Sequence, residues 1–202
     1  IVVKVALNND VDVFTLLAYR FLFAMLIQWT YALLRGKAKI IPYNILIRVA
    51  IVGIIGHACT SILYFSSLEL ITAILVSLLF ATYPAWTMIF EKLLHGVPFT
   101  FSRLSGLIAI FIGTVFLVVQ PGKTIAIDLN IGIILAVGNA ILLALYLVLS
   151  RSQLSRFSPE SLSPYYATSA FLFFLVIKPP WSLPILAFPP IGLVAALHFA
   201  IF

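Results

Sequence analysis

Apolar residues run through this chain in long blocks that are separated by short polar connections. The blocks cover, approximately, residues 1–7, 11–34, 44–68, 70–90, 104–119, 131–150, 161–177 and 191 onwards. Because the blocks are apolar on every side, their length rather than their periodicity separates helix from strand. Blocks of about 20 residues match α-helices that cross the ~30 Å hydrocarbon core of a membrane, whereas barrel strands would give alternating segments of ~10 residues. The pattern predicts an all-α, polytopic transmembrane helical bundle.

The composition supports a membrane protein. Hydrophobic residues make up 63% of the 202 residues and charged residues only 9%, whereas about 25% of the residues in an average soluble domain are charged. The net charge of +6 does not indicate a nucleic-acid partner, because the basic residues lie between apolar blocks and are not clustered with aromatic residues. The single cysteine, Cys59, excludes an internal disulfide and a cysteine-based zinc site.

The polar connections alternate in charge along the chain. Eight Lys and Arg residues lie in the connections 35–48, 91–103 and 151–160, and two lie in the connections between them. By the positive-inside rule, the basic connections are cytoplasmic. We therefore expect a multi-pass protein of the cell inner (plasma) membrane.

The stretch 70–103 combines an uncharged block with an internal proline. No charged residue lies between Leu70 and Phe90, and Pro84 lies well inside this block. A soluble helix seldom tolerates an interior proline, whereas in a membrane bundle neighbouring helices, hydroxyls or water can satisfy the freed carbonyl. We expect Pro84 to bend a helix beside a cavity, and Glu91 to anchor the end of that helix.

Arg20 is the first candidate for a functional residue. It lies about eight residues, or ~12 Å, inside the block that follows Asp12. A charge near the bilayer centre costs ~2.5–3.5 kcal/mol on insertion scales, so Arg20 should face a cavity or a partner. The alternatives are that it extends towards the outer headgroups, or that it forms a pair that only holds the bundle together.

Polar residues recur on one face of the block 44–68. At helical spacing this face carries Gly53, His57, Thr60, Ser61 and Tyr64. Such a stripe suits a water-lined path or close helix packing. His57 has the side chain of a proton carrier, but a single helix histidine is more often a hydrogen-bonded packing residue.

Further cavity candidates lie on the other blocks: Tyr83, Trp86, Asn139 and Tyr146. Together with Arg20, His57 and Tyr64, they form the predicted solute site. Polar and aromatic groups of this kind can bind an organic solute, or they can join helices by hydrogen bonds worth ~0.6 kcal/mol each. Gly113 follows Ser105 and Ala109 at four-residue spacing, which predicts a helix-packing face.

The sequence lacks the motifs of several other classes of protein. It has no Gly-rich phosphate loop for ATP, and no His-Glu-x-x-His, Cys-x-x-Cys or spaced Asp pair for a metal site or an intramembrane protease. All six carboxylates lie at or beyond the ends of the blocks, so a mid-membrane carboxylate relay for protons is missing from this sequence. We expect no cofactor, no metal and no enzymatic activity.

Two parts of the chain share a pattern. In each, a helix that ends near a basic residue, Lys4 or Arg151, precedes an aromatic and polar block, FTLLAYRFLF or SLSPYYATSAF. An odd number of spans in the first part would insert the second part upside down, as in the inverted repeats of secondary transporters. We expect one repeat over 1–120, without the start of its first helix, and a truncated second repeat over 130–202. The chain would then be a fragment of a longer protein.

Motifs in four blocks together resemble the EamA-type transporters of the drug/metabolite transporter superfamily. They read LLAYRFLFAMLI, ATYPAWTMIFEKLLHG, RLSGLIAIFIGTVFLV and GIILAVGNAILLALYLVLSR. The resemblance implies ten spans in two inverted five-helix repeats, a central cavity, and export or uptake of small organic metabolites. It also places Arg20, Pro84 and Glu91 at recurrent positions of the family.

The sequence therefore predicts a secondary transporter of a small organic metabolite that works by alternating access. Two alternatives stay open: a membrane-embedded lipid-modifying enzyme, with Glu91 and His95 as its candidate pair, and a non-transporting membrane bundle. The expected partners are the organic solute and the lipid bilayer. A homodimer is compatible with the sequence.

Overall fold

Long apolar sequences form helices in a membrane because a helix satisfies its own backbone hydrogen bonds where no water can do so. The computed structural model describes residues 12–118, 131–154 and 157–178, which contain helices and no strand. The helical segments are α2 (Val13–Leu34), α3 (Tyr43–Gly53), the π-helical η1 (Ile54–Cys59), α4 (Thr60–Leu70), α5 (Ala73–Phe80), α6 (Tyr83–His95), α7 (Phe101–Val118), α8 (Ile131–Leu154) and α9 (Pro159–Ile177).

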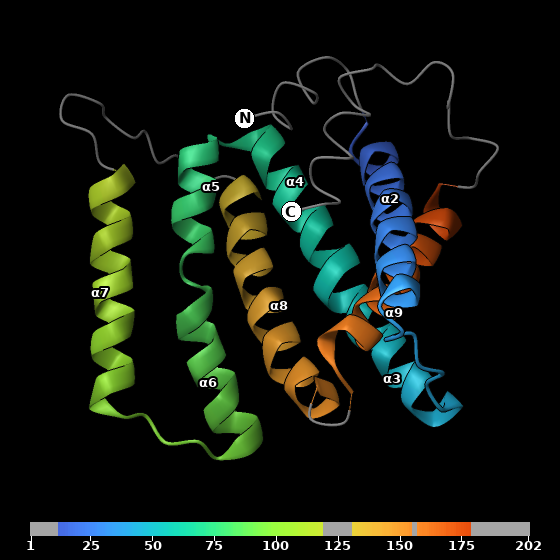
Figure 1. Cartoon of the computed structure of the whole chain (residues 1–202). Coiled ribbons are helices and arrows are strands. Elements are labelled where there is room, and N and C mark those ends of the chain that lie inside the picture. The colour runs from blue at the N-terminus through green and yellow to red at the C-terminus, as the bar shows by residue number, and fades with distance from the viewer. Residues whose placement is uncertain (1–11, 119–130, 155–156, 179–202) are drawn as a thin grey trace.

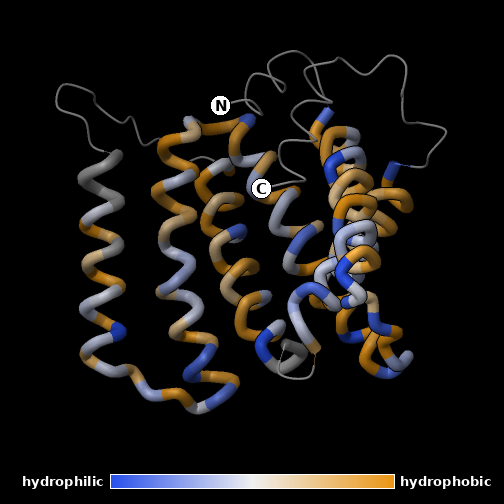
Figure 2. The backbone as a smooth tube through the Cα atoms, viewed as in Figure 1, coloured by the Kyte–Doolittle hydropathy of each residue, from blue (hydrophilic) through white to orange (hydrophobic). Residues whose placement is uncertain are grey.

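Four stretches are long and apolar enough to cross a membrane: Val13–Leu34, Tyr43–Leu70, Ala73–His95 and Ile131–Arg151. Figure 2 shows apolar residues along the length of the helices and hydrophilic residues mainly near their ends. These observations confirm the predicted all-α, polytopic helical bundle. The predicted blocks 1–7 and 191 onwards lie outside the described residues.

Taken as crossings, α2, α3–α4, α5–α6, α7, α8 and α9 run alternately in opposite directions (Figure 1). The ends of α2, α6 and α8 and the starts of α3, α7 and α9 lie at the same end of the bundle. We term this the basic end, because it carries Arg35, Lys37, Lys92, Arg103 and Arg151. The structure thus brings together the connections that the sequence identifies as basic.

Helices α2 and α9 pack against each other along their length in opposite directions. At one end, Lys178 Nζ lies 3.1 Å from Asp12 Oδ2. Further along, the rings of Phe21 and Phe174 stack with their centroids 5.5 Å apart, and Trp29 Nε1 donates to Thr168 Oγ1 over 2.9 Å. The partner numbers fall on α9 as they rise on α2, which is the register of an antiparallel pair.

The stretch Tyr43–Leu70 forms one membrane-crossing helix with a π-helical turn, η1, near its middle. The hydroxyl of Thr60 donates to the Gly56 carbonyl over 2.5 Å, which supplies a partner to a carbonyl within this turn. Gly53 and Gly56 lie where neighbours approach closely: a Cβ at Gly53 would overlap Ser169 of α9, and one at Gly56 would overlap Tyr146 of α8. Both glycines therefore allow neighbouring helices to pack tightly.

The next span is interrupted, which differs from the bent continuous helix that the sequence predicts. Helix α5 ends at Phe80, Ala81 and Thr82 form a turn, and α6 begins at Tyr83. Pro84 lies in the first turn of α6, where its missing N–H breaks no helical hydrogen bond. Pro84 therefore starts the second half of the span rather than bending it.

Among the described residues, Gly113 has no close neighbour of the kind that its predicted packing role would involve. A Cβ at Gly113 would meet no atom within 4 Å, and Ser105, Ala109 and Gly113 are all exposed. Within the described part of the chain, this face of α7 is therefore open. The spacing of small residues is common to packing faces and to faces that contact lipid, so spacing cannot separate the two.

Candidate solute cavity

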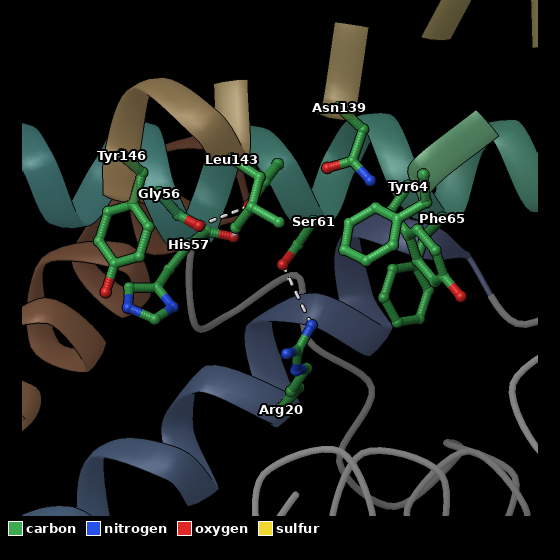
Figure 3. A pocket seen from close by; sticks show the side chains of 11 residues that line it. Arg20, Gly56, His57, Ser61, Tyr64, Phe65, Asn139, Leu143 and Tyr146 are labelled. Atoms are coloured by element: carbon green, nitrogen blue, oxygen red, sulfur yellow. Dashed lines mark hydrogen bonds between the residues drawn. The ribbon is translucent and has the colours of Figure 1, made fainter. Parts of the chain in front are cut away.

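A cavity of about 460 Å³, which we term the solute cavity, lies between α2, η1, α4, α5 and α8 (Figure 3). Its volume falls within the ~300–1,000 Å³ typical of small-molecule sites. It is lined by Arg20, Gly56, His57, Thr60, Ser61, Tyr64, Phe65, Phe80, Asn139, Leu143 and Tyr146. The lining combines one cation, several hydroxyls, an amide and aromatic rings.

Arg20 of α2 is held against α4 by a hydrogen bond and by aromatic rings. Its Nη1 donates to Ser61 Oγ over 3.0 Å, and its guanidinium carbon lies 5.0 Å from the centre of the Phe21 ring and 5.7 Å from that of Phe65. A cation over aromatic faces is stabilised even where water is scarce. Arg20 is the one formally charged side chain among the described residues that line the cavity.

His57 is surrounded by aromatic rings from three other helices. Its ring centroid lies 5.3 Å from that of Tyr146, 5.9 Å from that of Tyr166 and 6.3 Å from that of Phe21. These contacts are typical of a packing histidine, and yet His57 also lines the cavity. Its ring therefore forms part of the wall in addition to filling space between helices.

Helix α8 forms the wall opposite Arg20. Asn139, Leu143 and Tyr146 lie at i, i+4 and i+7 and therefore share one helix face. Asn139 is 2% exposed, and Figure 3 shows it on the opposite side of the cavity from Arg20. A buried amide supplies both donors and an acceptor, so this wall can both donate and accept hydrogen bonds.

Five of the seven residues predicted for the site line this cavity: Arg20, His57, Tyr64, Asn139 and Tyr146. Tyr83 lines a separate cleft between α6, α7 and α8, and Trp86 lines neither. Tyr83 and Trp86 belong to α6, which the turn at Ala81–Thr82 separates from α5. Phe80, the last residue of α5, lies at the cavity instead.

Several lining residues were absent from the predicted site. Phe65, Phe80 and Leu143 are apolar, and their sequence context does not distinguish them from residues that face lipid. Thr60 and Ser61 lie on the polar face of the block 44–68, beside His57 and Tyr64. Their position on that face was the feature of the sequence that pointed to the site.

Glu91 lies outside the cavity, at the basic end, and is paired with two arginines. Arg103 Nη1 of α7 lies 2.8 Å from Glu91 Oε2, and Arg151 of α8 contacts Glu91 Oε1. The side chain of Glu91 is 6% exposed, so one buried carboxylate links α6, α7 and α8. This is the geometry of an anchor at a helix end.

The alternative catalytic pair does not form an isolated acid and base. Both carboxylate oxygens of Glu91 accept from guanidinium groups, while His95 is exposed in the last turn of α6. Because both of its oxygens already accept from arginines of α7 and α8, Glu91 is placed as a link between helices and not as a partner of His95. In residues 12–118, 131–154 and 157–178, no group of three His, Cys, Asp or Glu side chains could hold a metal ion.

A search of curated proteins gives no match. One protein of known crystal structure is similar with a TM-score of 0.65 and 21% sequence identity, over 95% of this chain and 70% of that chain. At that identity, the similarity supports the fold alone.

The sequence profile of the EamA-like transporter family matches residues 1–119, which is more than half of the chain. This match agrees with the resemblance that the motifs of the first five blocks indicate. The chain therefore belongs to the EamA-like transporter family and is a multi-pass membrane transporter of the drug/metabolite transporter superfamily.

Proposed function

We propose that this protein is a secondary transporter that binds a small organic solute in the cavity between Arg20 and α8. The observation that carries the proposal is the convergence of polar and aromatic side chains from four separate membrane-crossing stretches on one cavity of about 460 Å³. Helix-joining polar groups would not by themselves leave a cavity of ligand size.

The lining favours a solute that has both a polar acceptor and an apolar or planar part. The Arg20 guanidinium has five N–H donors in a planar fork, and Ser61 accepts from one nitrogen of this group. Tyr64, Phe80 and Tyr146 supply ring surfaces around the same space. A small metabolite with a carboxylate or carbonyl at one end and carbon groups at the other would match both parts.

Alternating access is the mechanism that we propose for this cavity. Helix α8 and the antiparallel helix α9 would open the second of two inverted repeats, and the cavity would lie between α8 and the helices of the first repeat. Sites between repeats, near the bilayer midplane, become open to each side when the repeats rock against one another. We also propose that the basic end faces the cytoplasm across the inner or plasma membrane.

The proposal can be tested with the full-length protein in proteoliposomes. Vesicles are exposed to a defined mixture of common amino acids, small carboxylic acids and amines, and the lumen contents are measured by mass spectrometry. We expect at least one compound to accumulate in wild-type vesicles, and unlabelled compound in the lumen to accelerate uptake of the labelled form. That acceleration is the kinetic mark of a carrier whose site alternates between the two sides.

Two variants locate the site. Arg20→Gln should lower the flux by at least about tenfold, the equivalent of one lost hydrogen bond of ~1.5 kcal/mol to a charged group. Trp86→Phe, on a residue outside the cavity, should retain the wild-type flux. Equal fluxes in Arg20→Gln and wild type would refute the site, and the absence of trans-acceleration for a transported compound would refute alternating access.

A further inference from the structure

A second cavity, which we term the ionic cleft, lies between α6, α7 and α8. Its volume is about 390 Å³, and it is lined by residues from all three helices. The polar end consists of Glu91, Arg103 and Arg151. None of the residues that line the ionic cleft belongs to the solute cavity, so it is a separate place in the fold.

The polar end has more positive charge than its ion pairs neutralise. Arg103 and Arg151 share the single carboxylate of Glu91, which leaves one net positive charge. The side chains of Arg103 and Arg151 are 43% and 66% exposed, whereas that of Glu91 is 6% exposed. Each guanidinium carries five N–H donors, so one carboxylate leaves donors available on the exposed side.

An apolar wall continues from this polar end towards the middle of the span. Pro84 and Met88 of α6 face the same cleft as Leu107 of α7 and Leu147 of α8. Pro84 precedes Glu91 by about seven residues, so the wall runs ~10 Å along the helix axis. Gly106 adds no side chain, and a Cβ there would meet no atom within 4 Å, which leaves space beside the wall.

We propose that the ionic cleft binds an anionic phospholipid, with its phosphate against Arg103 and Arg151 and the upper part of an acyl chain along the apolar wall. Arginine is suited to phosphate because its planar fork can donate two parallel hydrogen bonds. Basic pockets between membrane helices are known to recognise anionic headgroups. The apolar wall favours a lipid over a free phosphate ion, which would leave that surface unfilled.

Purified full-length protein in detergent provides the test, with bound lipid counted by native mass spectrometry. The probes are phosphatidylglycerol and phosphatidylcholine with the same acyl chains. We expect wild type to prefer phosphatidylglycerol, and Arg151→Gln to reduce that preference by about fivefold, the effect of ~1 kcal/mol per cation near an anionic headgroup. Arg151→Gln keeps the Arg103–Glu91 pair. The matched control is Arg35→Gln, an exposed arginine at the basic end outside the cleft, and it should keep the preference.

A second pair of variants tests the apolar wall without changing charge. Gly106→Leu should fill the cleft and reduce the amount of bound phosphatidylglycerol. Gly113→Leu, on the same helix and also without atoms within 4 Å of an added Cβ, should not. The proposal is overturned by equal binding of the two lipids to wild type, by equal losses in Arg151→Gln and Arg35→Gln, or by equal losses in the two glycine variants. Full displacement of the lipid by inorganic phosphate would also overturn it, since that would indicate a simple anion site.

Discussion

Arg20 and Ser61 are joined by a hydrogen bond of 3.0 Å that links α2 to α4 at the wall of the solute cavity. The serine hydroxyl accepts from a guanidinium and so fixes the direction of the remaining donors. Ser61→Ala should therefore lower solute flux in proteoliposomes. The loss should reach about tenfold if the hydrogen bond to Ser61 contributes ~1.5 kcal/mol by orienting Arg20. Ser61→Thr keeps the acceptor and should retain most of the flux. Equal flux in the alanine variant and wild type would contradict an orienting role.

Glu91 should contribute to stability through its two arginine partners. Glu91→Gln removes the charge that both guanidiniums share, and we expect it to lower the free energy of unfolding by roughly 1–3 kcal/mol. This is less than the ~3–5 kcal/mol of a fully buried pair, because Arg103 and Arg151 are partly exposed. Unfolding by SDS titration in mixed micelles measures the difference. Glu69→Gln, at an exposed carboxylate on α4, is the control and should have little effect.

Asp12 should make stability depend on pH below about 4. Burial raises the pKa of its carboxyl, but hydrogen bonds from the Thr15 N–H and hydroxyl, together with Lys178, outweigh burial and hold the pKa below its usual value. A lowered folded-state pKa gives stability that is complete above the unfolded value of about 3.9 and is lost as the pH falls through the folded value. The Tm advantage of wild type over Asp12→Asn should thus be constant from pH 7 to 5 and shrink below about pH 4. A difference that persists unchanged at pH 3 would rule out this linkage.

Gly56 should tolerate no side chain while Tyr146 is present. A Cβ at Gly56 would overlap the Tyr146 ring, so Gly56→Ala should destabilise the protein by about 1–3 kcal/mol, as overpacking commonly does. Adding Tyr146→Ala should make the glycine substitution less costly, which a double-mutant cycle would detect as coupling. Gly138→Ala is the control, since its Cβ would lie at an ordinary 3.5 Å from Leu63 Cδ1. Additive effects of the two substitutions would contradict the contact.

The orientation of the bundle can be checked by cysteine labelling in a Cys59→Ser background. Ala38→Cys and Pro98→Cys lie in connections at the basic end, and Glu69→Cys lies near the opposite end. A membrane-impermeant maleimide should reach the first two from the cytoplasmic side and the third from the other side. Labelling of Ala38→Cys and Pro98→Cys from different sides would contradict the topology.

The sequence predicted the four membrane-crossing stretches, because hydrocarbon thickness fixes the length of a membrane helix. It also indicated Arg20, since a charge inside an apolar block is too costly to lack a polar environment. His57 and Tyr64 could be grouped because helical spacing places them on one face. The wall residues on α8, Asn139 and Tyr146, followed from the same argument.

Other features depend on contacts between helices, which the spacing within one helix does not contain. Phe80 is the last residue of α5 and lies at the cavity, and the spacing of residues within this span does not show where α5 ends. The partners of Glu91 come from two other helices, so its sequence context could suggest an anchor but could not name Arg103 and Arg151. Small residues at four-residue spacing occur on packed and on open helix faces alike, which is why the sequence could not show that Gly113 lacks a close neighbour among the described residues.

The π-helical turn Ile54–Cys59 lets a single membrane crossing serve two interfaces, since α3 packs on α9 and α4 packs on α8. A π turn closes with i→i+5 bonds and so accommodates one more residue than an α turn. One residue corresponds to roughly 100° of helical rotation. Deleting a residue from this segment would therefore turn α4 by that angle relative to α3 and carry Ser61 and Tyr64 away from the cavity. The number of residues in the turn thus sets which side chains of α4 line the cavity.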